Sequence, residues 1–361
     1  MRLYVTGSLA SQGRWSELFD ASAHVREAQK RIDPRVQMGG LRPNYGPTAA
    51  IMLGPLSRLE VLRSWALFSF VSVTVFLLSV RALAARCQTL AALTPLVVLV
   101  CAASPALFIT LRYGQLSAIT TALFIAAAAL DRRGRPFFAG FCLGMVAFKP
   151  HLVVPAGIVW LATLRWRLLA GLILGVALHL TVGVVVAGPD ATLEWLRTLV
   201  ALAQDPNLVQ GFPAEVHSLR GFWRLLGATP PGLSWLTAAS TGIVILGTVW
   251  IWRVRATSEW RWAALVTATV LVSPHLLTYD LLLMTIPLML ISEALLGAME
   301  QPRGWKWLAG GIYFAPLVSP SIAGVVGIQI STLLSVGLLS MIWQYGRLED
   351  SGSSSRPSIS S

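Results

Sequence analysis

Apolar runs of membrane-spanning length recur along this chain from Val61 to Trp343, and few charges interrupt them. Apolar residues make up 55% of the 361 residues and charged residues only 12%, which is about half the charged fraction of soluble domains. Such a chain cannot cover a water-facing surface, and its runs are too long for the alternating strands of an outer-membrane barrel. The sequence therefore predicts an all-α, polytopic transmembrane bundle.

The apolar runs predict about eleven membrane segments. They are expected at residues 62–82, 90–110, 115–130, 137–148, 151–164, 168–187, 233–252, 261–275, 279–297, 307–320 and 324–343. The chain then divides into an amphipathic region at 1–46, the bundle at 47–345 with a long loop at 188–232, and a disordered tail at 346–361. In the first region, Leu18 and Phe19 lie on an apolar face that suits a membrane surface.

Basic residues separate the connections between these segments into two sets. Fourteen lie in alternate connections and the tail, at Arg81, Arg86, Arg132, Arg133, Arg135, Arg165, Arg167, Arg253, Arg255, Arg261, Arg303, Lys306, Arg347 and Arg356. The opposite set holds only five, at Arg112, Lys149, Arg197, Arg220 and Arg224. By the positive-inside rule the first set is cytoplasmic, which predicts a multi-pass inner-membrane protein with a cytoplasmic C-terminus and residues 1–46 outside. The same placement accounts for the net charge of +12 without nucleic-acid binding.

Polar residues stand at the predicted outer ends of several segments, where polarity near hydrocarbon is costly. Arg112 lies in a turn just before Gln115, and its guanidinium suits a phosphate; alternatively, it is a snorkelling arginine in a tight turn. Tyr45 leads into an apolar stretch and marks either the lip of a cavity or only a turn.

Lys149 and His151 flank Pro150 between apolar runs of about 12 and 14 residues. At 1.5 Å per residue, neither run spans ~30 Å of hydrocarbon comfortably. The two side chains are therefore expected below the membrane surface, where a buried cation suits an anionic lipid head group. The alternative is a proline-kinked hairpin whose lysine reaches water.

His275, Tyr279 and Asp280 lie together in a second break between apolar runs. Asp280 precedes three leucines, so its carboxylate needs a partner or water. It is a candidate base, a metal ligand, or a partner for Lys149 or Arg112; alternatively, it caps a helix N-terminus.

Other chemical signals are weak. The three cysteines show neither metal-binding nor disulfide spacing, and no phosphate loop, metalloprotease helix or serine elbow is present. We therefore expect no cofactor and no metal. The lone residues His24, His179 and His217 are weaker signals, and His179, inside an apolar run, is interpreted as a packed, hydrogen-bonded side chain.

The same positions carry a resemblance to a known family. The matching stretches are Tyr4 to Ala10 with Gly13 and Glu17 to Asp20, Tyr45-Gly46-Pro47 through Pro55-Leu56, Gly114-Gln115, Ala139-Gly140 through Lys149-Pro150, and Ser273-Pro274-His275 through Tyr279-Asp280-Leu281. In order and spacing, the chain resembles glycosyltransferase family 87, the polyprenyl-phosphate-mannosyltransferase-like group with the multi-spanning GT-C architecture. The resemblance extends to about residue 345.

This resemblance implies transfer of a sugar from a polyprenyl-phosphate donor to a lipid or glycan acceptor outside the cytoplasm, generally without a metal. Lys149, Arg112 and His151 are then expected to bind the donor phosphate. Gln115, Tyr45 and Tyr279 are expected to line the pocket. An aspartate in the first outer loop is implied as general base on the acceptor hydroxyl.

The family's aspartate and first transmembrane helix would fall before Met1. The arginine pattern exposes the same gap independently, because no helix precedes residues 1–46 to export them. Either these residues lie on the cytoplasmic surface and the segment count is off by one, or a helix upstream of Met1 is missing. We hypothesise that Met1 is an internal start and that the natural chain begins upstream. In the chain as written, Asp280, Asp20 and His275 are the candidate catalytic residues, and Glu17 is a further substitute for the aspartate.

Two rival interpretations stay open. A transporter or lipid flippase would also place buried lysine and aspartate beside broken helices. Transporters usually carry internal repeats and polar sites at the midplane, and neither is evident in this sequence. An inactive membrane homologue is favoured by the missing aspartate.

Overall fold

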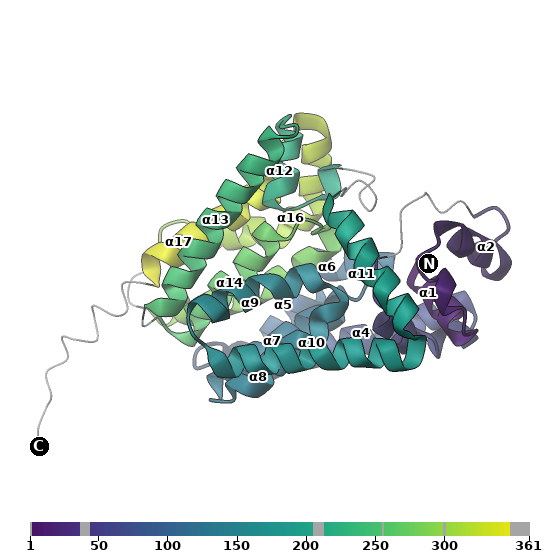
Figure 1. Cartoon of the computed structure of the whole chain (residues 1–361). Coiled ribbons are helices and arrows are strands. Elements are labelled where there is room, and N and C mark those ends of the chain that lie inside the picture. Colours follow the sequence, from purple (N-terminus) through teal and green to yellow (C-terminus); the bar gives the residue numbers. More distant parts are fainter. Residues whose placement is uncertain (1, 37–43, 205–212, 255, 299–300, 347–361) are drawn as a thin grey trace, which may run out of the picture.

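The computed structural model describes residues 2–36, 44–204, 213–254, 256–298 and 301–346. Of the tail expected at 346–361, residues 347–361 lie outside these ranges. Within these ranges every regular element is a helix, and one isolated antiparallel bridge joins Val216 to Leu277. The predicted all-α class is confirmed. Figure 1 shows the helices as a bundle with a smaller group of helices at one end.

Within the described ranges, five helical stretches are long and apolar enough to cross a membrane. They are α4 (Val61–Ala84), α10 (Trp166–Ala187), α13 (Gly232–Arg253), the stretch Thr278–Leu296 formed by η7 and α15, and α16 (Trp305–Val326). The stretch Leu90–Ala102 of η3 and α5 meets α6 (Pro105–Tyr113) at a bend of 45°, and this pair would make a sixth span. These helices support a multi-pass membrane protein.

Shorter helices fill the space between these spans. They are α7 (Ser117–Arg132), α8 (Pro136–Gly144) with the 3-10 turn η4 (Met145–Phe148), α9 (Pro150–Ala162), α14 (Ser258–Val272) and α17 (Ile330–Tyr345). None exceeds 16 residues, so at 1.5 Å per residue each is shorter than the ~30 Å hydrocarbon core. The count of about eleven membrane segments therefore stays a prediction.

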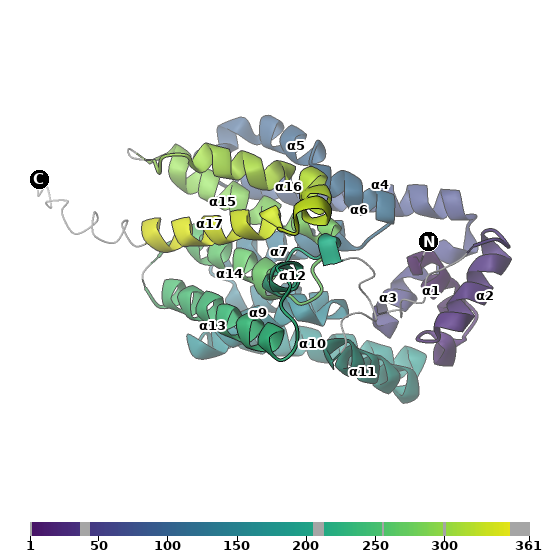
Figure 2. The same ribbon diagram turned by 90° about the horizontal axis from the view of Figure 1, so that it is seen from above.

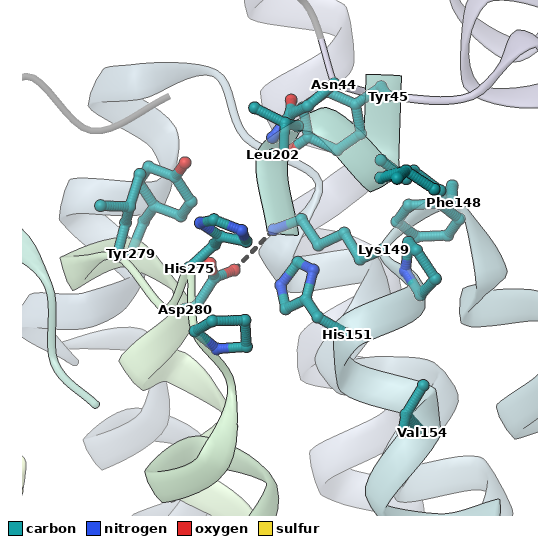
Figure 3. A pocket seen from close by; sticks show the side chains of 15 residues that line it. Asn44, Tyr45, Phe148, Lys149, His151, Val154, Leu202, His275, Tyr279 and Asp280 are labelled. Carbon is teal, nitrogen blue, oxygen red and sulfur yellow. Dashed lines mark hydrogen bonds and ion pairs between the residues drawn. The ribbon is translucent and has the colours of Figure 1, made fainter. Parts of the chain in front are cut away.

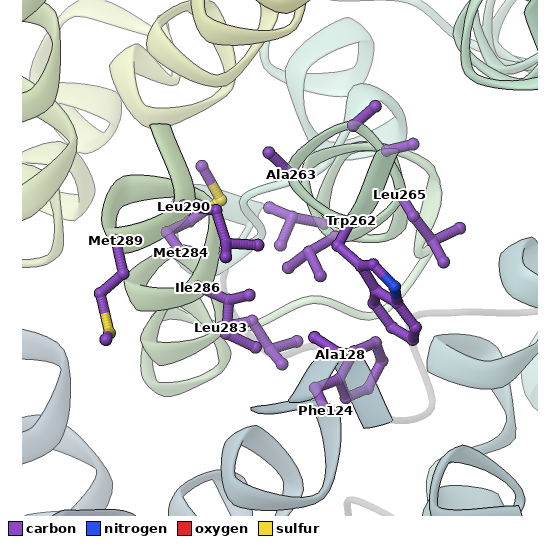
Figure 4. Packing of buried hydrophobic residues seen from close by; sticks show 14 of the residues in the cluster. Phe124, Ala128, Trp262, Ala263, Leu265, Leu283, Met284, Ile286, Met289 and Leu290 are labelled. Carbon is purple, nitrogen blue, oxygen red and sulfur yellow. The ribbon is translucent and has the colours of Figure 1, made fainter. Parts of the chain in front are cut away.

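Helix α14 lies inside the bundle. Every residue from Trp262 to Leu271 is buried, as expected for a helix that is apolar on all sides. Its neighbours include α7, α9, α15 and α17. Figure 4 shows side chains of α14, α7 and α15 gathered in this core.

The N-terminal helices lie at the opposite end of the bundle from the C-terminal end of α17 (Figures 1 and 2). This group comprises α1 (Arg2–Ser11), α2 (Ala21–Arg31) and α3 (Pro47–Leu53), with α11 (Pro189–Gln204) beside it. The apolar face predicted to rest on a membrane is covered by protein. Leu18 and Phe19 pack in one cluster with Leu9 of α1 and Trp195 of α11.

Several basic connections are tied together by their own side chains. Arg132 forms an ion pair with Glu259 at 2.9 Å, and Arg253 Nη2 donates to the carbonyl oxygen of Ala162 at 2.8 Å. The connections near residues 132, 162 and 253–259, which the arginine pattern assigned to one side of the membrane, therefore lie close to one another.

Glycines let α8 and α10 approach closely. Gly140 and Gly144 of α8 pack against the part of α10 that carries Gly171 and Gly175. Within each helix the two glycines are four residues apart, a spacing typical of membrane helix contacts. A Cβ atom on Gly140 would lie 1.9 Å from the carbonyl oxygen of Leu168. Any larger side chain would therefore push the two backbones apart, and α8 with η4 leads directly into Lys149.

We expect Gly140→Ala to lower the free energy of unfolding by about 2 kcal/mol, because the new methyl group overlaps backbone atoms that cannot rotate away. The matched control is Gly242→Ala in α13, where a Cβ atom meets nothing within 4 Å. Thermal unfolding in detergent measures both variants. Equal melting temperatures would contradict the close contact between α8 and α10.

Glu27 of α2 is buried and connects α2 to α1. Its carboxylate accepts hydrogen bonds from Ser8 at 2.6 Å and Gln12 at 2.7 Å. It also pairs with Arg14 at 2.9 Å and Arg31 at 3.3 Å. Burial raises the pKa of Glu27, but the four donors outweigh burial and the net pKa is lowered. The ionised carboxylate therefore stabilises the packing of α1 on α2.

The lowered pKa makes this packing sensitive to acid. The contribution of Glu27 to stability is complete above its unfolded pKa of about 4.3 and is lost as the pH falls through the lower folded value. We expect amide exchange of residues 21–31, corrected for the intrinsic rate, to rise in acid in the wild-type protein. In Glu27→Gln the exchange should be raised at pH 7 and insensitive to pH. A wild-type protein with pH-independent exchange would contradict this role.

Candidate functional site

The first part of the site is the break between η4 and α9, which carries Lys149. Pro150 is the first residue of α9, where its missing N–H costs no hydrogen bond. The residue before a proline is kept out of the α region, so Lys149 leaves the helix and serves as the N-cap residue. Its side chain is only 5% exposed.

The second part is the break between α14 and η7 (Thr278–Met284), which carries His275, together with the first turn of η7, which carries Tyr279 and Asp280. Asp280 lies in the first turn of η7 and is 2% exposed. The N-cap residue of η7 is Leu277, so Asp280 does not hold the helix-capping position that was one interpretation of the sequence. Its carboxylate has side-chain partners instead.

Lys149 and Asp280 form a buried ion pair in which Nζ lies 2.5 Å from Oδ1 (Figure 3). Ser117, the first residue of α7, joins them: its hydroxyl donates to Asp280 Oδ1 at 2.6 Å and accepts from Lys149 Nζ at 3.1 Å. Three elements far apart in the sequence therefore meet at one carboxylate oxygen. The pair satisfies two charges that would otherwise be costly to bury.

Two tyrosines stand against the ammonium group. Lys149 Nζ lies 5.2 Å from the ring centroid of Tyr279 and 5.7 Å from that of Tyr45, both within cation–π range. The Tyr45 hydroxyl donates to Gln115 Oε1 at 2.6 Å. Burial raises the pKa of Tyr45, with the charge of Asp280 adding to it, so this phenol remains a protonated donor at neutral pH.

A cavity of about 340 Å³ opens beside the ion pair. Figure 3 shows the side chains that line it, with His151 and His275 facing each other near the Lys149–Asp280 contact. The two imidazoles are 6.1 Å apart in an edge-to-face arrangement. His151 Nε2 is buried and has no hydrogen-bond partner within the described residues. Burial lowers the pKa of His275 to about 4, so its ring is neutral at pH 7.

The structure brings together six of the residues singled out from the sequence. Tyr45, Lys149, His151, His275, Tyr279 and Asp280 line the cavity. Gln115 was also expected to line it, but it contributes only by accepting the hydrogen bond of the Tyr45 hydroxyl. Arg112 is not among the lining residues: it is exposed, and its guanidinium lies 6.0 Å from the ring of its neighbour Tyr113. The ring centroid of Tyr113 in turn lies 6.0 Å from that of Tyr279.

Asp20 lies elsewhere. It is the exposed N-cap residue of α2, where it accepts from Ser22 N at 2.8 Å and lies 3.5 Å from Arg26. It lines a separate cavity between the start of α2 and α11, together with Asp190 and Glu194.

Sequence reasoning missed Ser117, Asn44 and Phe148. Asn44 and Phe148 line the cavity, and Ser117 bridges the ion pair. The signal for Ser117 was a hydroxyl two residues after Gln115, at the start of an apolar run. Within the described residues, no three His, Cys, Asp or Glu side chains lie close enough to hold a metal ion.

The fold and the site together define a multi-pass membrane protein with an ion pair and two imidazoles at a cavity between its helices. The sequence model of Glycosyltransferase family 87 matches residues 44–274, well over half of the chain. The chain therefore belongs to glycosyltransferase family 87 and is a membrane glycosyltransferase, which confirms the resemblance seen in its motifs. The matched segment contains Tyr45, Gln115 and Lys149. Comparisons with curated proteins and with solved structures found no match.

The buried pair predicts a characteristic pattern of stability. Lys149→Met leaves the carboxylate of Asp280 buried without its cation, so we expect a loss of about 3–5 kcal/mol. Lys149→Met combined with Asp280→Leu removes both charges and should be clearly more stable than either single variant.

Thermal unfolding of the full chain in detergent checks this pattern. Arg112→Met serves as the control, because its exposed guanidinium should contribute less than about 0.5 kcal/mol. Additive losses in the double variant would show that the two charges do not depend on each other.

Proposed function

We propose that this glycosyltransferase uses a polyprenyl-phosphate sugar as donor and a lipid or glycan acceptor outside the cytoplasm. The observation that carries the proposal is the buried Lys149–Asp280 pair in a cavity within an apolar bundle. Such a donor has a long hydrocarbon tail and one phosphate, so its site needs apolar surroundings for the tail and a buried cation for the phosphate.

Lys149 is the residue we assign to the donor phosphate. Its ammonium group has three N–H donors, of which Asp280 and Ser117 take two within the described residues. The third donor is available for a phosphate oxygen. His151 Nε2 is a second candidate donor, because it is buried at the cavity and has no partner in the described part of the chain.

The transfer requires one bond to form and one to break. The acceptor hydroxyl oxygen attacks the anomeric carbon of the sugar, the bond from that carbon to the phosphate oxygen breaks, and its electron pair stays on the phosphate. Lys149 stabilises the charge that develops on this leaving group.

The hydroxyl proton needs an acceptor, and Asp280 and His275 are the groups at the cavity that we assign to this role. Asp280 is paired with Lys149, whereas His275 is neutral and partly exposed. Asp20 lines another cavity and is left out of this assignment.

The orientation of the chain is part of the same proposal. The fourteen basic residues of one set of connections and the tail favour the cytoplasm for that end of the bundle. The breaks at Lys149 and His275 then lie at the extracytoplasmic face of the inner membrane, where the acceptor would approach.

The proposal predicts sugar transfer in vesicles that contain the full chain. With radiolabelled polyprenyl-phosphate mannose and membrane lipid as acceptor, the wild-type protein should move label into a new glycolipid. Lys149→Ala should reduce the rate by about 10²–10³-fold, because a preorganised charge is lost at the developing phosphate charge.

Matched variants separate the roles. Arg112→Ala, at the exposed arginine, should reduce the rate by less than about tenfold, since a charge screened by water contributes little. His275→Ala should lower kcat with little change in KM for the donor, since it removes a proton acceptor and no phosphate contact. Equal losses in Lys149→Ala and Arg112→Ala, or lipid movement across the vesicle without label transfer, would refute the proposal.

A further inference from the structure

A buried polar junction lies behind the break that carries His275 and Asp280. Its centre is His217, which is fully buried and lies between η6 (Pro213–Glu215) and α12 (Leu219–Leu225). His217 Nε2 lies 2.8 Å from Thr278 Oγ1, and His217 Nδ1 lies 2.6 Å from Ser331 Oγ. Both ring nitrogens therefore have a hydroxyl partner, one on η7 and one on α17.

Backbone contacts reinforce this junction on the side of the cavity. The His217 amide donates to the carbonyl oxygen of Leu276 at 2.9 Å, and Val216 forms the isolated bridge with Leu277. Residues 276 and 277 lie outside any helix, so they lack the ladder of helical hydrogen bonds. The His217 amide satisfies the carbonyl oxygen of Leu276 in its place, whereas the carbonyl oxygen of Leu277 accepts from the Asp280 amide at 2.8 Å.

A glutamine holds the same segment from the opposite side. Gln329, at the turn between α16 and α17, donates through Nε2 to the carbonyl oxygens of Ala214 at 2.7 Å and Val216 at 3.1 Å. Its Oε1 accepts a hydrogen bond from Ser319. Residues 214–217 are therefore fixed between the α16–α17 turn and the break at 276–278.

The chemistry of His217 suits a fixed support. Burial lowers its pKa to about 3, although the charge of Asp280 acts in the opposite direction. The ring is thus neutral at pH 7, with one nitrogen donating and the other accepting. His217 is 0% exposed and is not a lining residue of the cavity, so it acts through the residues that it contacts.

We propose that His217 is a positioning residue that holds residues 276–280 in place, and thereby keeps Asp280 and the adjacent His275 at the cavity. Thr278 is the link: it accepts or donates at His217 Nε2 and lies two residues before Asp280. The effect of His217 on sugar transfer rests on the proposed function, whereas its effect on the order of the break does not.

The first test measures that order directly. In the full chain in detergent, His217→Ala should raise amide exchange of residues 273–284 at least tenfold. The control is His24→Ala, which removes another buried imidazole, bonded through Nε2 to the carbonyl oxygen of Leu18 at 2.9 Å. It should leave exchange at 273–284 unchanged. Unchanged exchange in His217→Ala, or an equal rise in both variants, would overturn the proposal.

The second test asks which ring nitrogen matters. A glutamine amide reaches about the position of Nε2 and an asparagine amide about that of Nδ1, so His217→Gln keeps the contact with Thr278 and His217→Asn keeps the contact with Ser331. We expect His217→Ala to lower kcat for sugar transfer on the order of 100-fold, as for misplaced reacting groups, with KM for the donor little changed. His217→Gln should retain most of the wild-type rate of sugar transfer, and His217→Asn should not.

The outcomes separate the two proposals. Equal activity in the Gln and Asn variants, or full activity in His217→Ala, would overturn the positioning role. A wild-type protein that transfers no sugar from the polyprenyl-phosphate donor would refute the proposed function, and amide exchange would then decide the role of His217 alone.

Discussion

The buried ion pair between Lys149 and Asp280 is the contact on which the site depends. Burying either charge alone in an apolar bundle would carry a large desolvation cost. That cost is offset only when the two charges pair and both form further hydrogen bonds. The pair therefore requires two interrupted helices to end at the same point: one break frees Lys149 before Pro150, and the other frees Asp280 after α14. Ser117 completes the contact from a third element.

The packing around the pair explains how the breaks are held together. Gly140 and Gly171 let α8 approach α10 until backbone meets backbone, which fixes the helix that delivers Lys149. On the other side, His217 and Gln329 support the break that delivers Asp280. The charged pair is thus placed by contacts that are either tightly packed or fully hydrogen-bonded, and both kinds leave little freedom to move.

In the function that we propose, this arrangement suits a phosphate leaving group in an apolar setting. A cation already paired with a carboxylate can be buried without a ligand, and one remaining N–H donor can then meet a phosphate oxygen. The two imidazoles and two tyrosines beside it supply neutral donors and acceptors. Membership of glycosyltransferase family 87 gives the chain its class of chemistry, and in the function that we propose Lys149 binds the donor phosphate.

The sequence by itself determined the helical membrane class, the family, and the two breaks at Lys149 and His275–Asp280. The class and the breaks follow from the length of apolar runs, from proline and from costly ionisable residues, which are all local properties of the chain. The family follows from the resemblance carried by short motifs in order and spacing. Only the tertiary structure decided the partners. It paired Asp280 with Lys149, left Arg112 exposed, covered Leu18 and Phe19 with protein, and joined His217 to Thr278. Partners depend on which helix faces which, and that is set by packing between segments far apart in the chain: Lys149 and Asp280 are 131 residues apart, and His217 and Thr278 are 61 apart.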